Sequence, residues 1–489
     1  MTNELLRSLP SIETLLERPI AYRLFAELGR DRVRDLLRDI TEEIRGEVAS
    51  GHLPVTNGSE HLSQEIERRL EARAVESARP SLRRVINATG VIIHTNLGRA
   101  PLARQSAEAV AEAASHYSNL EYDLARGERG RREIHCQELL GRLTGSEATV
   151  LANNNAAAVL LVLNTLAEGG EVIVSRGELI EIGGSFRIPD VMQKSGAILR
   201  EVGTTNRTRI ADYQNAINER TKLILRVHPS NYRIVGFTER PSVNEIADLA
   251  RNAGVPAYED LGSGCLIDLA PYGVTDEPVV AESLKAGIPV VSFSGDKMLG
   301  GPQAGVIAGS REVVDRVRRN PLMRALRVDK MTYAAIEATL RLYERGVAVK
   351  EVPVVRAIAA GRDEIAERAA RFRASIGRVT NGRLKTSIED GTSVIGGGSA
   401  PEVELQTVLV TLEHAEMSAA SLEQKLRGYT IPVIARTEHD RVVIDLRTVA
   451  VHEESIVLDA IAALEDGATV STVGQGSGSR LQSATDFHS

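Results

Sequence analysis

Hydrophobic residues recur at helical spacing over the first part of the chain. Between about residues 5 and 48, Leu, Ile, Val and Phe fall three or four positions apart, which is the pattern of amphipathic helices. The Gly-, Pro- and Asn-containing stretch GHLPVTNGSE interrupts this pattern, and a further helix is predicted over residues 61–78. We therefore expect a small helical N-terminal domain over residues 1–78.

Beyond about residue 80 the pattern changes to brief β-branched runs that alternate with Ala- and Leu-rich helical segments. This alternation is typical of an α/β protein with a mostly parallel sheet and helices on both faces. The large domain is expected over residues 79–335, with seven strands at residues 147–153, 171–177, 197–202, 221–227, 255–260, 289–295 and 304–310.

The last part of the chain repeats the alternation on a smaller scale. Strand patterns between residues 383 and 447 and a helical pattern from residue 454 predict a C-terminal α+β domain over residues 336–466. The Gly- and Ser-rich segment 467–489 has the composition of a disordered tail.

Composition narrows the class of protein. The chain has 489 residues, of which 43% are hydrophobic and 26% charged, with no Trp. No apolar run approaches the roughly 20 residues that cross a bilayer, and the N-terminus lacks a signal-peptide pattern, so we expect a cytoplasmic protein without a membrane partner. Cys136 and Cys265 form no metal motif. A net charge of −7 does not favour DNA as a partner and leaves RNA undecided.

Polar residues suited to ligand binding or catalysis follow three of the predicted strands. Asn153, Asn154 and Asn155 open an apolar helix, Asp260 precedes LGSG, and Ser294 stands three residues before Lys297. Ligands of open α/β sheets bind outside the carboxyl ends of the strands. Pyridoxal phosphate requires three such groups: a helix start that offers N–H groups to its phosphate, a carboxylate for its ring nitrogen and a lysine for its aldehyde.

In this interpretation Lys297 holds the aldehyde as a Schiff base, Asp260 keeps the ring nitrogen protonated, and Ser294 and the three asparagines bind the phosphate. Each residue also has an ordinary structural interpretation. The asparagines are equally consistent with a helix N-cap, Asp260 with a turn cap, and Lys297 with a solvated loop position. Their order along one sheet favours the cofactor, and the chain lacks the GxGxxG motif of a dinucleotide site.

Eight segments together resemble one family. They are INATGVIIHTNLGRAPL (86–102), YSNLEYDLARGERGRR (117–132), NNNAAAVLL (153–161), RGELIEIGGSFRIPDVM (176–192), EVGTTNRT (201–208), HPSNYRIVGF (228–237), EDLGSG (259–264) and the segment around Lys297. In family order they resemble the bacterial selenocysteine synthases, the L-seryl-tRNA(Sec) selenium transferases, from about Leu9 to residue 465.

The resemblance implies a fold-type-I pyridoxal-phosphate transferase that forms a ring-shaped homodecamer and engages tRNA through its N-terminal domain. It also implies the reaction: L-seryl-tRNA(Sec) loses its β-hydroxyl to give a dehydroalanyl intermediate, and selenium from selenophosphate adds to give L-selenocysteinyl-tRNA(Sec). Lys297 would exchange the Cα proton.

The same resemblance assigns an anion clamp to Arg99, Arg324 and Arg327. A spacing of three would place Arg324 and Arg327 on one helix face. Surface ion pairing is their ordinary interpretation, and in related small-molecule enzymes such arginines bind a substrate carboxylate instead.

Several further residues near the predicted strand ends are weaker candidates. His228 and Tyr232 follow the strand at 221–227, and Asp296 precedes Lys297. His94 and Thr95 precede Arg99 and are candidates for a site shared with a neighbouring subunit. Glu181 receives no role, and Cys136 and Cys265 are expected to be small buried residues.

The N-terminal domain gives a weak electrostatic argument for RNA, because acids slightly outnumber its arginines. Candidate tRNA contacts are Arg30, Arg32, Arg34 and Arg38, and a capping or oligomerisation domain is the alternative. Two other functions stay open: a small-molecule pyridoxal-phosphate lyase or transferase on the same scaffold, and a tRNA-binding protein with a vestigial cofactor site. The presence of Asp260, Ser294 and Lys297 argues against the last.

Overall fold

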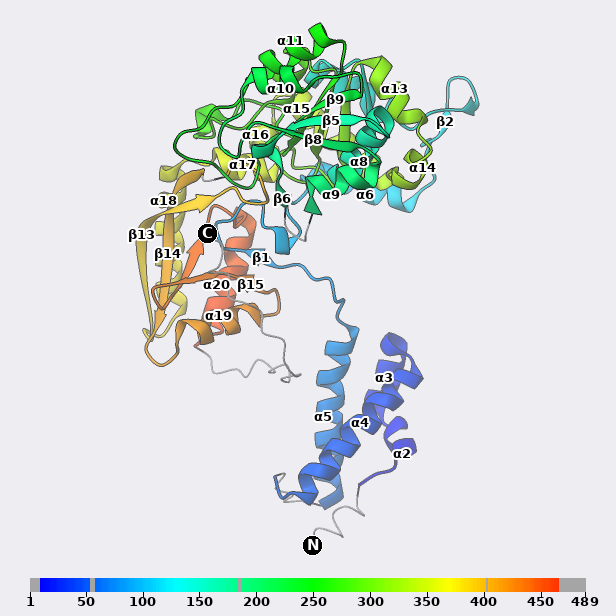
Figure 1. Cartoon of the computed structure of the whole chain (residues 1–489). Coiled ribbons are helices and arrows are strands. Elements are labelled where there is room, and N and C mark those ends of the chain that lie inside the picture. The colour runs from blue at the N-terminus through cyan, green and yellow to red at the C-terminus, as the bar shows by residue number, and fades with distance from the viewer. Residues whose placement is uncertain (1–8, 53–57, 183–185, 402, 466–489) are drawn as a thin grey trace. The chain divides into compact units, whose positions relative to one another are not determined.

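The computed structural model describes residues 9–52, 58–182, 186–401 and 403–465 (Figure 1). The expected tail at 467–489 lies outside the described residues. The chain divides into two compact units, Met1–Arg84 and Val85–Ser489, each with its own core. Among the described residues, no helix is both long and apolar enough to cross a membrane.

The first unit is helical, as the hydrophobic spacing predicted. It contains α2 (Ile12–Leu16), α3 (Pro19–Leu28), α4 (Arg30–Ala49) and α5 (Gly58–Ala78). The buried residues of α4 follow the helical period, from Val33 through Ile40 to Val48, and pack with Leu62, Ile66 and Leu70 on α5.

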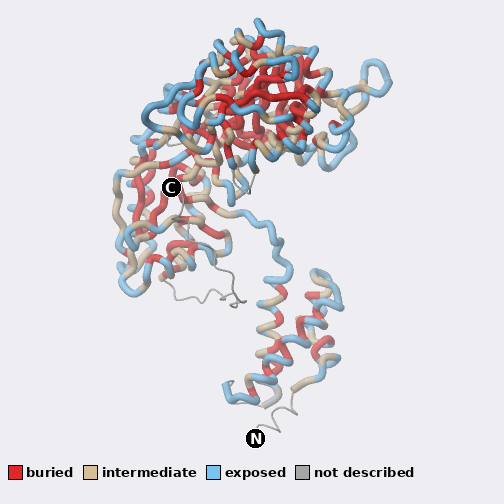
Figure 2. The backbone as a smooth tube through the Cα atoms, viewed as in Figure 1, coloured by how far each residue is buried: buried red, intermediate tan, exposed pale blue. Residues whose placement is uncertain are grey.

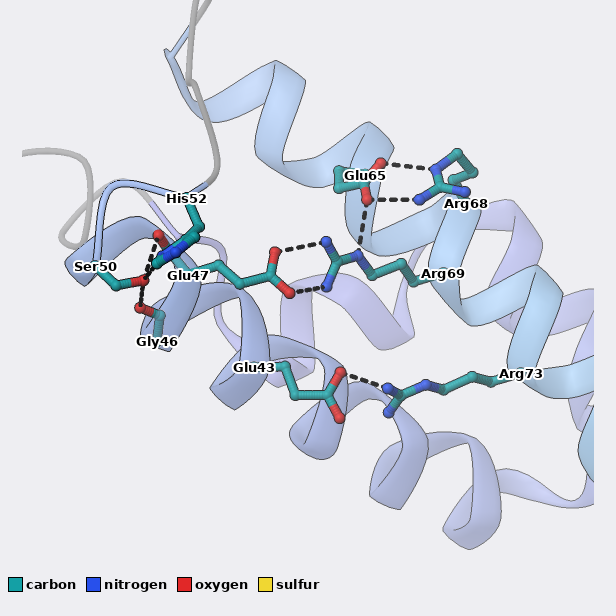
Figure 3. A network of polar contacts seen from close by, with 9 residues as sticks. All are labelled: Glu43, Gly46, Glu47, Ser50, His52, Glu65, Arg68, Arg69 and Arg73. Atoms are coloured by element: carbon teal, nitrogen blue, oxygen red, sulfur yellow. Dashed lines mark hydrogen bonds and ion pairs between the residues drawn. The ribbon is translucent and has the colours of Figure 1, made fainter. Parts of the chain in front are cut away.

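Ion pairs join the same two helices on the outside of this core (Figure 3). Arg69 of α5 donates to both carboxylate oxygens of Glu47 on α4, at 2.8 and 2.7 Å, and its Nε donates to Glu65 at 2.7 Å. Arg73 likewise pairs with Glu43. The unit therefore keeps apolar side chains inside and neutralises its charges at the surface.

All seven strands predicted for the large domain exist and form one sheet, confirming the expected architecture. They are β4 (Ala148–Ala152), β5 (Glu171–Ser175), β8 (Ile198–Val202), β9 (Thr221–Val227), β10 (Ala257–Gly262), β11 (Val290–Ser294) and β12 (Gly305–Gly309). Their order is β4-β12-β11-β10-β9-β5-β8, and only β12 runs antiparallel to its neighbours. Most of these strands are buried along their whole length, as Figure 2 shows.

Helices cover both faces of this sheet because successive strand residues point to opposite sides. On β11, Val290 packs with the core of α8 (Asn155–Ala167), α9 (Ile188–Ser195) and α13 (Arg311–Arg319), whereas Val291 and Phe293 pack on the other face. That second face carries α7 (Ile134–Thr144), α10 (Ile210–Ala216), α11 (Val243–Ala253), α12 (Val280–Lys285) and α15 (Lys330–Glu344), and α6 (Arg104–Ser115) packs against α15.

The C-terminal layer contains an antiparallel sheet in the order β13-β14-β17-β16. Its strands are β13 (Leu384–Val394), β14 (Glu404–His414), β16 (Arg436–Glu438) and β17 (Arg441–Asp445), with α18 (Arg362–Val379), α19 (Ala419–Arg427) and α20 (Glu454–Ala462) (Figure 1). A two-residue strand, β1 (Ile86–Asn87), pairs with β15 (Val433–Ile434), so the segment that opens the second unit packs in this layer.

Short elements complete the second unit. Two small hairpins are formed by β2 (Tyr122–Asp123) with β3 (Glu128–Arg129) and by β6 (Glu181–Ile182) with β7 (Phe186–Arg187). The remaining short helices are α14 (Met323–Leu326), α16 (Ala348–Glu351) and α17 (Pro353–Ala359).

Candidate active site

Lys297 lies in a buried turn directly after β11. It is only 6% exposed, and its Nζ donates a hydrogen bond to the carbonyl oxygen of Gly398 at 3.2 Å. Burial lowers the pKa of this amine below its ordinary value, and the nearby charge of Asp260 partly opposes that shift. The solvated-loop interpretation of Lys297 is therefore wrong, because the side chain is enclosed by protein.

Asp260 is buried on β10, the strand that neighbours β11 in the sheet. One carboxylate oxygen accepts hydrogen bonds from Nδ2 of Asn155 at 2.7 Å and from the backbone N–H of Gly262 at 3.1 Å. Burial raises the pKa of Asp260, while these two donors and the charges of Lys297 and His228 oppose the rise. A cationic partner would offset the cost of burying this carboxylate.

The three asparagines after β4 have different contacts. Asn154 is the N-cap of α8, and its Oδ1 accepts the backbone N–H of Ala157 at 2.9 Å. Asn155 turns its amide toward Asp260 and leaves Oδ1 buried without a partner among the described residues. Asn153 is exposed, and its backbone N–H donates to Leu326. The N-cap interpretation thus holds for the side chain of Asn154.

Ser294 and Asp296 flank the turn that carries Lys297. Ser294 ends β11 and is buried. Asp296 is also buried, and it accepts a hydrogen bond from Nη1 of Arg99 at 2.8 Å. The positive charge of Arg99 acts to lower the pKa of Lys297, so Arg99 lies within electrostatic range of the amine.

Arg324 and Arg327 lie elsewhere, in an arginine-rich cavity of about 380 Å³. Their expected placement on one helix face is wrong: α14 ends at Leu326, and Arg327 is extended and forms a bridge with Ala152. Both nevertheless line the cavity, together with Arg129, Arg131, Arg132 and Arg318. The only carboxylates in its described lining are Glu121 and Glu133, so the cavity carries an excess of positive charge. Arg99 is not among the described residues that line it.

His228 and Tyr232 lie beside a second cavity, of about 370 Å³, at the carboxyl end of β9. The backbone N–H of His228 donates to the backbone carbonyl oxygen of Asp260, and the Nε2 of His228 is buried without a hydrogen-bond partner among the described residues. The hydroxyl of Tyr232 donates to the carbonyl oxygen of Gly177. His228 therefore belongs to the surroundings of Asp260, whereas Tyr232 contacts the loop after β5.

The remaining candidates have structural surroundings. His94 is partly buried and precedes a 3-10 turn at Thr95–Leu97, and burial lowers its pKa. Glu181 pairs with Arg187 at 2.7 Å. Cys136 and Cys265 are both buried, which confirms that interpretation, and desolvation raises the pKa of the Cys265 thiol to about 12.

Sequence reasoning missed two parts of the site. Gly398 supplies the acceptor for Lys297, and Glu277 is a buried carboxylate whose Oε2 lies 3.7 Å from Nε2 of His228. The run of three glycines at 396–398 was a signal, because consecutive glycines between two strands indicate a close backbone approach. Glu277 stands in a loop without a motif, and nothing in its spacing points to the site.

The residues present fit pyridoxal phosphate. A buried amine with a lowered pKa lies after β11, and a buried carboxylate with a raised pKa lies on the neighbouring strand β10. Around them, Asn155 Oδ1, His228 Nε2 and Ser399 Oγ are buried without a partner in the described part of the chain. Buried polar atoms are normally satisfied, so unfilled capacity at one place indicates a polar ligand.

A mostly parallel seven-stranded sheet with a buried lysine after one central strand and an aspartate on the next defines the fold-type-I class of enzymes. Within that class, residues 85–450 match the family model for L-seryl-tRNA selenium transferase, and residues 6–45 match the model for the selenocysteine synthase N terminus. The chain belongs to the L-seryl-tRNA selenium transferase family, which confirms the resemblance.

Individual relatives agree with this assignment. The L-seryl-tRNA(Sec) selenium transferase of Nitratidesulfovibrio vulgaris is 50% identical over 455 residues, which cover 91% of this chain and 96% of the relative. That of Desulfomicrobium baculatum is 48% identical, over 94% of this chain and 99% of the relative. A solved D-glucosaminate-6-phosphate ammonia-lyase shares the fold, with a TM-score of 0.53 at 20% identity over 78% of this chain and 96% of its own.

Proposed function

We propose that this protein converts L-seryl-tRNA(Sec) to L-selenocysteinyl-tRNA(Sec), with selenophosphate as selenium donor and pyridoxal phosphate as cofactor, in the cytoplasm. The observation that carries the proposal is the buried Lys297 amine next to Asp260 in a chain that is 50% identical to a curated transferase of that name.

Lys297, Asp260 and the residues around them would hold the cofactor. Pyridoxal phosphate supplies an electron-withdrawing ring that stabilises negative charge at the substrate Cα. The lowered pKa of Lys297 favours the neutral amine, which is the form that bonds to an aldehyde and accepts a proton. Asp260, fixed by Asn155 and Gly262, would face the ring nitrogen and keep its proton in place.

Two proton-transfer steps follow from the chemistry of a seryl ester. The Nζ of Lys297 would take the proton from the seryl Cα, and the β-hydroxyl would leave with a proton as water. After the selenium of selenophosphate has added at Cβ, Lys297 would deliver a proton to Cα, and water would cleave the phosphorus–selenium bond to release phosphate. The burial of the amine would limit the access of water, which competes with selenium for the Cβ of the dehydroalanyl group.

Selenophosphate would bind where positive charge exceeds negative charge. The cavity at Arg324 and Arg327 supports this assignment because planar guanidinium groups form paired, charge-assisted hydrogen bonds with phosphate oxygens. Arg99 does not line this cavity in the same subunit but binds Asp296, the residue before Lys297. It would therefore reach the anion only if the homodecamer expected for this family brings the cavity of a neighbouring subunit to Lys297.

The tRNA would be engaged by the helical N-terminal unit. Arg30, Arg34 and Arg38 on α4 each lie within 4.0 Å of a carboxylate, and Arg32 donates to Ser77. Exposed pairs of this kind are weak, so a phosphate backbone would compete for these arginines at little cost. Deleting residues 1–84 should abolish turnover of the tRNA substrate and leave the visible absorption of the bound cofactor in place.

The direct test is turnover. Protein loaded with pyridoxal phosphate is incubated with seryl-tRNA(Sec) and selenophosphate, and the amino acid released from the tRNA is identified by mass spectrometry. We expect selenocysteine, and only serine when selenophosphate is left out. Consumption of free serine with no selenium on the tRNA would instead support a small-molecule lyase or transferase.

A further inference from the structure

Glu277 is a buried carboxylate that the proposed reaction does not use. Its side chain is 1% exposed and lies in the loop between β10 and α12. Within the described residues it has no arginine or lysine partner; its contacts are Ser263 Oγ, the backbone N–H of Ala400 and, at 3.7 Å, His228 Nε2. A buried carboxylate without a full counter-charge is costly, and its contacts point to a specific role.

Two of these contacts lead to opposite sides of Lys297. Ser263 donates its hydroxyl to Glu277, and its carbonyl oxygen accepts the backbone N–H of Met298, the residue after Lys297. On the other side, Ala400 donates its N–H to Glu277 at 2.9 Å, two residues after Gly398, whose carbonyl accepts the Lys297 amine. One carboxylate thus connects the backbone of the lysine turn with the loop that receives its side chain.

The loop at Gly396–Ala400 needs such an anchor because its backbone is unusual. Gly396, Gly397 and Gly398 have φ of 74°, 64° and 68°, and Ala400, which has a side chain, has φ of 44°. Non-glycine residues are strained in this region. The fit is also close: a Cβ at Gly397 would lie 2.3 Å from Ile93 Cγ2, and one at Gly398 would lie 3.5 Å from Lys297 Nζ.

We propose that Glu277 is a positioning residue, which holds the glycine loop against Lys297 and orients the imidazole of His228 at the end of β9. A charge-assisted hydrogen bond to Ala400 N–H offsets the strain at that residue. The negative charge of Glu277 also raises the pKa of Lys297, as do those of Asp260 and Asp296, whereas burial and the charge of Arg99 lower it. The inference rests on the proposed function only for its effect on turnover, because the placement of Lys297 is tested separately.

The test compares Glu277→Gln with wild-type protein, both loaded with pyridoxal phosphate. Glutamine keeps the size but removes the charge and one acceptor. We expect kcat for seryl-tRNA(Sec) to fall about tenfold or more with KM for the tRNA within about twofold. The pH midpoint of the visible band of the Lys297-bound cofactor should move to lower pH by about half a unit, since a negative charge that favours the protonated form is lost.

Glu171→Gln is the matched control. Glu171 is also buried, but it accepts Asn218 and pairs with Arg220 at the opposite end of the sheet. It should leave both the band midpoint and the kcat unchanged. An unchanged midpoint and kcat in Glu277→Gln would overturn the proposal, as would an equal midpoint shift in Glu171→Gln.

Ser263→Ala provides a second variant if Glu277→Gln does not fold. It removes one contact of the carboxylate, and kcat should fall about threefold or more without a change in KM; an unaltered kcat would contradict the role. Should wild-type protein bind the cofactor but fail to convert seryl-tRNA(Sec), the proposed function fails, while the absorption titration still decides the role of Glu277.

Discussion

The surface arginines of the N-terminal unit and the charged groups of the candidate sites in the second unit have different surroundings. In the N-terminal unit, arginines at the surface of α4 and α5 meet carboxylates, as Arg69 meets Glu47 and Glu65 (Figure 3). In the second unit, Lys297, Asp260 and Glu277 are buried, and the cavity at Arg324 is lined by six arginines and two glutamates. The number of arginines in a region therefore does not indicate an anion-binding site. The excess of arginines over carboxylates and the burial of the charged groups do.

The largest effect should come from removing the buried amine. Lys297→Ala is expected to lower kcat by at least about 10³-fold, because it removes both the attachment point and the proton acceptor. Turnover and the visible absorption of the protein measure this loss. Lys285→Ala, at an exposed lysine of α12, is the control and should behave as wild type. If Lys297→Ala kept its turnover, the buried lysine would be no more important for the reaction than the exposed Lys285, which would contradict the prediction.

The next effect should come from the unbalanced cavity. Arg324→Gln is expected to reduce kcat/KM for selenophosphate by about 10- to 100-fold, the range for losing a hydrogen bond to a charged group, with the KM for tRNA unchanged. Arg319→Gln serves as control, since Arg319 on α13 is exposed and donates to the backbone of Asp315. Equal effects of the two substitutions would mean that the cavity does not bind the anion.

A smaller effect, on stability rather than turnover, is expected in the N-terminal unit. Arg69→Gln removes the bridge between α4 and α5, and should lower the free energy of unfolding of that unit by about 1–2 kcal/mol. Arg45→Gln breaks an exposed pair within α4 and should cost no more than about 0.5 kcal/mol. Thermal unfolding followed by circular dichroism separates the two; an Arg69→Gln variant as stable as Arg45→Gln would show that the network adds nothing.

The same network also predicts a pH dependence of stability, which appears only in acid. Hydrogen bonds from Arg68 and Arg69 hold the pKa of Glu65 at about 2, below its ordinary value of 4.5. The stabilisation from Glu65 is therefore complete above pH 4.5 and is lost as pH falls toward 2. Unfolding of the N-terminal unit by denaturant should become easier across this window in wild type, and less so in Glu65→Gln. The same dependence of the unfolding free energy on pH in wild type and in Glu65→Gln would contradict the lowered pKa of Glu65.

The sheet was accessible from sequence because most of its strands are buried on both faces and appear as apolar runs. Lys297 and Asp260 were accessible for a related reason: polar residues that end such runs must lie at one edge of the sheet. The order of the strands was not predictable from these runs, since it depends on crossovers that local patterns do not record.

Contacts between distant segments account for what sequence reasoning missed. Glu277 is hydrogen-bonded to Ala400, which is 123 residues away in the sequence, and Lys297 to Gly398, which is 101 residues away. The spacing of Arg324 and Arg327 wrongly predicted one helix face. Helix α14 ends at Leu326, and Arg327 instead forms a β-bridge with Ala152. From the sequence, Asn155 was assigned to the phosphate site. Its hydrogen bond to Asp260 becomes visible only in the folded chain.

In the proposed function, the enclosed Lys297 acts on an aminoacyl ester carried by tRNA. The most direct measurement is a titration of the visible absorption of the protein loaded with pyridoxal phosphate, with free serine and, separately, with seryl-tRNA(Sec). We predict a spectral change with seryl-tRNA(Sec) and none with serine. A change with free serine and none with the charged tRNA would contradict the claim.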